Sequence, residues 1–317
     1  MKLTENDLRI LTAVARYHVL SASLIHRMIF PQRNDRRHTR RRLQQLVQSN
    51  YLRRSAVNIA FASGSFGPVY SVTERTCDAL AVYYNDDAWL SLNTKPLRTD
   101  RLHHWLDIAW THWIVDRAAE CCDAVKLDTW INEWQSTCDA DGNPTGYVLH
   151  SQFRETPPLS CSPDAAFLLD VAGHRRVYYV EIDRGTTGVR RVAASKTPGY
   201  AELARRQTHR KHFPTTTCDD FSILLITVSA NHRDRLRCEV AKKTDVRPDL
   251  WLFADREEFT TETALFGDIF HDHIGAVGPL LNRALLGADL PAVETTANAS
   301  LETARGASVE GGPTDAA

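Results

Sequence analysis

Acidic residues beside two apolar segments are the first candidates for chemistry. Glu181 and Asp183 end the run VYYVEID, residues 177–183, and Asp164 follows Pro163 where the preceding apolar run begins. Alternate side chains of a strand share a face, so Glu181 and Asp183 should project together, about 6.5–7 Å apart. If the two runs form a hairpin, Asp164 approaches Glu181. Converging carboxylates suit Mg²⁺, a hard ion that prefers oxygen ligands.

A fourth acid, Glu120, is expected to join this group from a long helix. On a helical wheel of the segment 102–122, Glu120 lies about 20° from Trp113, on the stripe that should face a sheet. The residues therefore predict a metal site, and its ligands would be Glu120, Asp164, Glu181 and Asp183. The alternative remains that these acids are ordinary polar residues where strands leave a sheet.

The segment RNDRRHTRRRLQQLVQSNYLRR, residues 33–54, is the second chemical signal. On a helical wheel its apolar side, with Leu43 and Leu46, lies opposite a polar side. The polar side comprises Arg37, His38, Arg41, Gln45 and Gln48. Arginine can bridge two acceptors of guanine and glutamine can pair with adenine, so this side suits the major groove of DNA.

Further arginines flank that helix and suit contacts with phosphates, which position a protein without reading sequence. They are Arg33, Arg36, Arg40, Arg42, Arg53 and Arg54. Two alternatives remain for the segment: a solvated charged face, or a surface that binds protein. Both are weakened by the scarcity of acids on this face, because exposed helix faces usually mix the two signs of charge.

The distribution of charge supports the DNA interpretation. The formal net charge of the 317 residues is −1, but residues 1–60 hold 12 Lys or Arg and only 3 acids, a surplus of +9. A second basic segment, residues 190–212, holds 7 basic residues and 1 acid. Such asymmetry points to a nucleic-acid contact at the basic parts. The alternative for residues 190–212 is a surface helix whose basic side chains form ion pairs with acids of the same domain.

Other classes of protein are disfavoured by composition. No apolar run approaches the ~18–20 residues that span a bilayer, and the N-terminus lacks the apolar core of a secretory signal. The seven cysteines are odd in number and form no CxxC pair, which argues against a disulfide framework or a zinc knuckle. We therefore expect a cytoplasmic protein without a membrane partner.

The elements that must position these residues follow from periodicity. Helices are expected at about 4–18, 21–30, 34–50 and 73–84, with two strands and a Gly/Ser turn between the last two. Residues 85–100 read as a linker. A helix at 102–122 then precedes strands at 127–134, 164–171, 175–183, 221–228 and 250–253, with helices at 189–212 and 231–243. Strands interleaved with helices predict an α/β (α+β) fold.

The order of these motifs resembles a known family. Pro163-Asp164 followed by Glu181-x-Asp183, after a long helix ending in Glu120, resembles the PD-(D/E)xK nuclease-like fold. With an N-terminal winged helix-turn-helix and the run VEIDRGT, residues 180–187, the chain looks like the plasmid replication-relaxation family. The resemblance implies a winged helix at 1–90 and, at 101–285, a PD-(D/E)xK-like mixed sheet flanked by helices. Residues 286–317 are predicted from composition to be a disordered tail.

The sequence departs from the active nucleases of this fold at one position. The resemblance implies a catalytic set of Asp164, Glu181 and a lysine, but Asp183 stands where that lysine is expected. Lys196 on the following helix is an alternative source of positive charge. Pro198-Gly199 is expected to break the helix between Lys196 and Tyr200, which disfavours their alignment.

Three functions remain open at this point. The first is a protein that binds double-stranded DNA in the replication or relaxation of a plasmid or mobile element, without a cofactor. The second is a Mg-dependent endonuclease or nickase that uses Asp164, Glu181, Asp183 and Lys196. The third is a winged-helix transcriptional regulator. A homodimer is common among winged helices, although no heptad or interface stripe supports one here.

Overall fold

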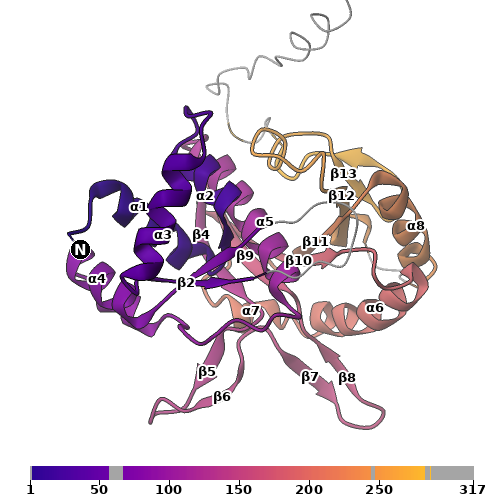
Figure 1. The fold of residues 1–317 in the computed structure, drawn as a ribbon. Coiled ribbons are helices and arrows are strands. Elements are labelled where there is room, and N and C mark those ends of the chain that lie inside the picture. Colours follow the sequence, from indigo (N-terminus) through magenta and orange to yellow (C-terminus); the bar gives the residue numbers. More distant parts are fainter. Residues whose placement is uncertain (1, 57–66, 244–246, 283–285, 287–317) are drawn as a thin grey trace, which may run out of the picture.

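The structure, a computed structural model, describes residues 2–56, 67–243, 247–282 and 286. Within these residues the chain is a mixed α/β protein with eight α-helices and a mixed sheet of seven strands (Figure 1). The predicted α/β class is confirmed. The tail predicted at 286–317 lies outside the described residues except for Leu286, and so does most of the Gly/Ser turn before Pro68.

The N-terminal unit contains four helices and a three-stranded antiparallel sheet in the order β1-β3-β2. Its elements are α1 (Glu5–Tyr17), β1 (Leu20–Ser21), α2 (Ala22–Ile29), α3 (Arg37–Gln48), β2 (Leu52–Ser55), β3 (Val69–Val72) and α4 (Glu74–Tyr84). Thr4 and Asp7 form the capping box that begins α1. Ser21 caps α2 by accepting a hydrogen bond from the Leu24 amide.

Helix α5 (Leu102–Glu120) joins the two parts of the molecule. It follows a short 3₁₀ helix, η1 (Asp87–Ser91), within the segment that we had interpreted as a linker. One side of α5 packs on the large sheet, and the other contacts α1 and β1. Its residues Ile108 and Ile114 belong to one apolar cluster that also contains Ile10 of α1 and Phe167 of the sheet. The two parts therefore share a core.

The large sheet has the strand order β14-β13-β12-β11-β10-β9-β4. Its strands are β4 (Val125–Asn132), β9 (Ala165–Val171), β10 (His174–Asp183), β11 (Phe221–Thr227), β12 (Trp251–Asp255), β13 (Phe270–Asp272) and β14 (Val277–Gly278). The pairs β4–β9 and β9–β10 are antiparallel, whereas β10, β11 and β12 run parallel. The five strands predicted from sequence are all present, with bounds shifted by up to two residues.

Alternate residues of the strands enter two different cores. Phe167 and Tyr178 pack in the cluster on the α5 side, whereas Leu168 and Tyr179 pack in a second cluster with Tyr200. The second cluster lies under α6 (Val189–Arg205) and α8 (Ala230–Ala241), which cover that face of the sheet. The predicted helix at 189–212 is thus two helices, α6 and the short α7 (His209–His212).

Two small hairpins that we did not predict project from one edge of the molecule (Figure 1). They are formed by β5 (Ser136–Cys138) with β6 (Pro144–Tyr147), and by β7 (Ser151–Arg154) with β8 (Leu159–Cys161). Their strands have three or four residues and are largely exposed. Such strands carry no sustained apolar alternation, so the period-two pattern of a half-buried strand is missing from their sequence.

Candidate DNA interface and carboxylate site

Helix α3 presents arginines on its exposed side. Thr39, Leu43 and Leu46 are buried against the N-terminal unit, whereas Arg37 and Arg41 are exposed. The other exposed polar residues of this stretch are Arg36, His38, Arg40, Gln44 and Gln48. Within the residues that the structure describes, none of these four arginines forms an ion pair with an acid. A strongly basic surface without neutralising acids is available to a polyanion.

Arg42 does not belong to this surface. Its guanidinium forms an ion pair with Asp7, a fully buried residue, and Nη1 donates a hydrogen bond to Gln45 Oε1 at 2.8 Å. Burial alone would raise the pKa of Asp7, but hydrogen bonds from Arg42 and Thr4 hold it below its usual value. The phosphate role predicted for Arg42 and the base contact predicted for Gln45 are therefore corrected, because Arg42 binds Asp7 of α1 and Gln45 accepts a hydrogen bond from Arg42.

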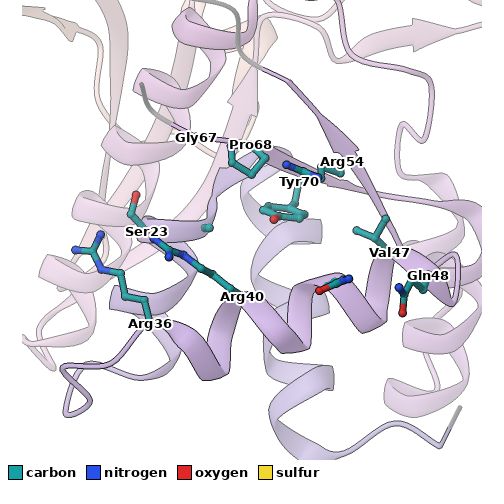
Figure 2. A pocket seen from close by; sticks show the side chains of 11 residues that line it. Ser23, Arg36, Arg40, Val47, Gln48, Arg54, Gly67, Pro68 and Tyr70 are labelled. Carbon is teal, nitrogen blue, oxygen red and sulfur yellow. The ribbon is translucent and has the colours of Figure 1, made fainter. Parts of the chain in front are cut away.

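Part of the basic side of α3 lines a concave surface that encloses a cavity of about 670 Å³ (Figure 2). Figure 2 shows Arg36 and Arg40 coming from the α3 segment, Arg54 and Tyr70 from the small sheet, and Ser23 from α2. Among the described residues that line this cavity, none is acidic. Arg36, Arg40 and Arg54, three of the arginines predicted to contact phosphates, therefore line one hollow.

The other predicted DNA-binding residues have separate surroundings. Arg53 is half-buried and its Nη1 donates a hydrogen bond to the Thr94 carbonyl oxygen at 2.7 Å, so it ties β2 to the segment that precedes α5. Arg33 and His38 both lie against Phe30, with the Arg33 guanidinium 5.8 Å from the ring and the His38 ring edge-on at 5.4 Å. Arg33 and His38 remain exposed beside the start of α3.

Asp164, Glu181 and Lys196 meet where β9 begins and β10 ends. Lys196 Nζ lies 2.6 Å from Glu181 Oε2, and it donates a hydrogen bond to the Ser162 carbonyl oxygen at 3.3 Å. Asp164 accepts a hydrogen bond from the Ile182 amide at 2.8 Å. The side chain of Glu181 is only 5% exposed, so an apolar sheet face ends in a buried acid with a lysine partner.

Pro198 and Gly199 do not break α6, contrary to our expectation. The helix continues through both residues, so Lys196 and Tyr200 stand one turn apart on the same side. Tyr200 donates a hydrogen bond to Glu181 Oε1 at 2.8 Å, while Lys196 binds the other oxygen. Gly199 lets α6 approach β8, because a Cβ there would lie 2.5 Å from the Ser160 carbonyl oxygen.

Burial and charge separate the acidities of the two carboxyls. Burial raises the pKa of Glu181 to about 7, against the pull of Lys196 and with help from the charge of Asp164. Burial also opposes ionisation of Asp164, but Lys196 and His104 outweigh it and keep its pKa below the usual value. One carboxyl is thus ionised at neutral pH, while the other titrates near neutrality, as is frequent at functional sites.

Asp183 lies on the same side of β10 as Glu181 but has a different partner. Nε2 of His232, on α8, lies 2.8 Å from Asp183 Oδ2. Both acids line one cavity of about 250 Å³, together with Asp164 and Lys196. The structure therefore gathers all four predicted catalytic residues at one hollow, although Asp183 bonds to α8 rather than to the Asp164–Glu181 pair.

Glu120 is not part of this site. It ends α5, is exposed, and forms an ion pair with Arg117 one turn before it. The end of α5 that reaches the carboxylates is its beginning, at His104, about 24 Å along the helix axis from Glu120. The prediction that Glu120 is a metal ligand is therefore wrong. The first turn of α5 lies beside Asp164, and the helix runs away from it, so its last turn is distant from the site.

His104 and Glu133 are site residues that the sequence analysis missed. His104 Nε2 lies 3.2 Å from Asp164 Oδ1 and 3.8 Å from Glu133 Oε1. One ligand atom from each of the three residues lies within 4.8 Å of the others, a spacing that a metal ion could bridge. Burial alone would lower the pKa of His104, but Asp164 and Glu133 raise it above its usual value. Only the fold joins these residues, which come from α5, the end of β4 and the start of β9.

The basic segment 190–212 is largely paired with acids of its own surroundings. Arg205 and Arg206 bind Glu202, and Arg210 binds Asp219. Arg190 approaches Glu239 of α8 at 3.7 Å. This outcome favours the alternative of a self-paired surface helix, with Lys196 as the member that enters the carboxylate site.

The fold and the site together define the class of protein. It is a mixed α/β protein with a lysine-paired carboxylate site at the ends of adjacent strands, joined through α5 to a helical unit with a basic face. The family model described as replication-relaxation matches residues 11–216, well over half of the chain. The chain therefore belongs to the replication-relaxation family.

Other comparisons add no closer relative. Neither the curated proteins nor the solved structures contain a significant match to the chain. Among the described residues, no helix has the length and apolar character needed to cross a membrane.

Proposed function

We propose that this protein binds double-stranded DNA in the replication or relaxation of a plasmid or mobile element. The N-terminal unit would act as a winged helix, with α3 in the major groove and the β2–β3 strands as the wing. The observation that carries the proposal is the exposed basic side of α3, whose arginines have no acidic partner within the described residues. The family description supports the process.

Salt dependence of binding tests this proposal. With the full chain and a duplex of mixed sequence, neutralising about five phosphates would give a log–log salt slope near −4.5. Arg41→Ala should weaken binding, by about 1–3 kcal/mol at a site where Arg41 contacts a base. Arg205→Ala is the matched control, because Arg205 is equally a helix-surface arginine but pairs with Glu202. Binding that ignores salt, or that falls equally in both variants, would refute the proposal.

A Mg-dependent endonuclease or nickase is the second candidate, favoured by the contacts of Glu181. The oxygens of Asp164, Glu181 and the Ser162 carbonyl all lie around Lys196, and an oxygen-rich donor set suits Mg²⁺. Asp164 and Glu181 would hold the ion, which would supply charge neutralisation at a phosphodiester oxygen. Lys196 would provide, from α6, the positive charge that Asp183 cannot.

A nicking assay separates the two candidates. Supercoiled plasmid should become open circles with Mg²⁺ but not with EDTA if the site is a nuclease. The double variant Asp164→Ala plus Glu181→Ala should abolish that conversion while it retains DNA binding through α3. Nicking that persists in the double variant would exclude this site as its source. If no divalent metal supports nicking, the non-catalytic role stands, and operator-specific binding alone would favour a transcriptional regulator. A homodimer and a cytoplasmic location stay predictions.

A further inference from the structure

A third cavity, of about 860 Å³, lies between the two parts of the molecule. The side chains that line it come from α2 and the loop after it, from α5, and from the ends of β11 and β12. Its charged residues are Arg27, Arg33, Arg36, Arg256 and Glu257, so four arginines face one acid. We call this cavity the interunit groove. Arg36 also lines the concave surface beside α3, so the two hollows are adjacent.

The interunit groove continues toward the carboxylate site. Arg256, Trp110 and Val228 line both the groove and a small recess beside it. That recess shares Asp183 and Arg184 with the cavity of Asp164, Glu181 and Lys196. Four hollows with shared lining residues therefore adjoin one another between α3 and the carboxylates: the concave surface beside α3, the interunit groove, the recess and the carboxylate cavity. Residues of α5 line each of them except the concave surface.

The arginines of this path are held in place by contacts that leave positive charge available. Arg256 and Arg184 both bind the carboxylate of Asp107, at 2.6 Å and 3.3 Å, so two cations share one buried anion. Burial raises the pKa of Asp107 despite these two arginines. Arg27 is exposed, and its guanidinium lies 5.0 Å from the ring of Trp110. A cation held over an aromatic ring needs little further ordering when it meets a phosphate.

We propose that one DNA molecule occupies both parts of the protein at once. The duplex would be read by α3, and its flanking backbone would run along the interunit groove, past Arg27 and Arg33, toward Glu181 and Lys196. This inference rests on the proposed DNA binding by α3. It names a different second contact from the basic segment 190–212, whose arginines are largely neutralised by nearby acids.

The test compares two duplexes of mixed sequence, bound by the full chain over a range of salt concentrations. A duplex of about 15 bp covers roughly one and a half turns, and one of about 30 bp adds flanking DNA. Arg27→Ala removes one cation from the groove. Glu257→Lys replaces the acid of the groove with a cation, and the exposed Glu257 makes no ion pair within the described residues. Glu155→Lys, on the β7–β8 hairpin, is the matched control for the same change of charge.

On the 30-bp duplex, Glu257→Lys should bind several-fold more tightly and Arg27→Ala several-fold more weakly. Their salt slopes should be steeper and shallower by about one, respectively, because about one counterion is released per phosphate contact. On the 15-bp duplex both variants should match wild type. An equal gain from Glu257→Lys and Glu155→Lys, or an equal effect on both duplexes, would overturn the inference. If either of these outcomes occurs but Arg41→Ala still weakens binding to both duplexes, only the groove inference fails and the proposal that α3 binds DNA stands.

Discussion

Arg41 and Arg42 are neighbours on α3, but their side chains have opposite surroundings. Arg41 is exposed on the basic side, while Arg42 binds the fully buried Asp7. The helical repeat of 100° per residue is enough to move a side chain from the solvent to the contact with α1. A run of three arginines therefore contains both a candidate ligand contact and a structural ion pair.

The two residues should separate in a pair of variants. Arg42→Ala leaves the Asp7 carboxylate buried without its cation, and we expect the free energy of unfolding to fall by about 3 kcal/mol. Arg41→Ala should leave it within about 0.5 kcal/mol of wild type, as for other exposed substitutions. Urea unfolding at pH 7 measures both. Equal stability of the two variants would contradict the structural role of Arg42.

At this scale the sequence was informative about residue type and poor about partners. Asp164 and Glu181 could be selected because acids at the ends of apolar strands are costly to bury without a partner, whereas Lys196 was selected through the family resemblance. His104 and Glu133 could not, because nothing in their local pattern distinguishes them from surface residues. Glu120 was selected by helical phase alone, which gives the side of a helix but not the end that reaches a site.

At the scale of the element, α6 depends on Gly199 for its approach to β8. The Cβ of an alanine there would lie 2.5 Å from the Ser160 carbonyl oxygen, whereas one at Gly188, before the first residue of α6, would contact nothing within 4 Å. Backbone cannot yield as easily as the end of a side chain, so α6 would have to move. Lys196 and Tyr200, which hold Glu181, would move with it.

We therefore expect Gly199→Ala to lower the free energy of unfolding by about 1–3 kcal/mol, as overpacking does elsewhere. Gly188→Ala is the matched control and should leave stability nearly unchanged. Thermal unfolding of the two variants gives the comparison. A stable Gly199→Ala protein would show that α6 does not need this close approach.

Helices and strands were predictable where a single pattern of apolar residues continued over the whole element. The strands β9, β10 and β11 carry unbroken apolar segments because both of their faces are covered. The β5–β6 and β7–β8 hairpins carry none. The helix predicted at 189–212 ends at Arg205, just before Gln207, whose backbone has a φ of 51°. Pro198 was interpreted as a break, although the helix around it is supported by its packing on the sheet.

At the scale of the whole molecule, the N-terminal unit is joined to α5 and to the β4 end of the large sheet through aromatic contacts and a hydrogen bond. His18, after α1, stacks on Trp134 with ring centroids 4.3 Å apart, and His112 of α5 stacks on Trp130 at 4.2 Å. Asp116 of α5 accepts a hydrogen bond from Tyr17 at 2.6 Å. The two parts are thus joined around His112, which is buried, and His18, which is half-buried.

This junction should make stability depend on pH. Burial lowers the pKa of His18 to about 4, and burial with the nearby charge of Arg16 holds that of His112 well below its usual value. In the unfolded chain both would titrate near 6.5. Below about pH 6.5 the unfolded state therefore binds protons that the folded state does not, so the free energy of unfolding falls progressively as pH drops toward 4.

The histidines can be tested by replacing one titrating ring with an aromatic ring that has no titratable group. Each histidine contributes up to about 1.4 kcal/mol per pH unit over this range, so the loss between pH 7 and pH 5 should be smaller in His112→Phe than in wild type. Phenylalanine retains the stack on Trp130 but has no proton to take up. Urea unfolding at the two pH values measures the difference. An identical loss in both proteins would place the acid sensitivity elsewhere, for example in the carboxylates paired with arginine.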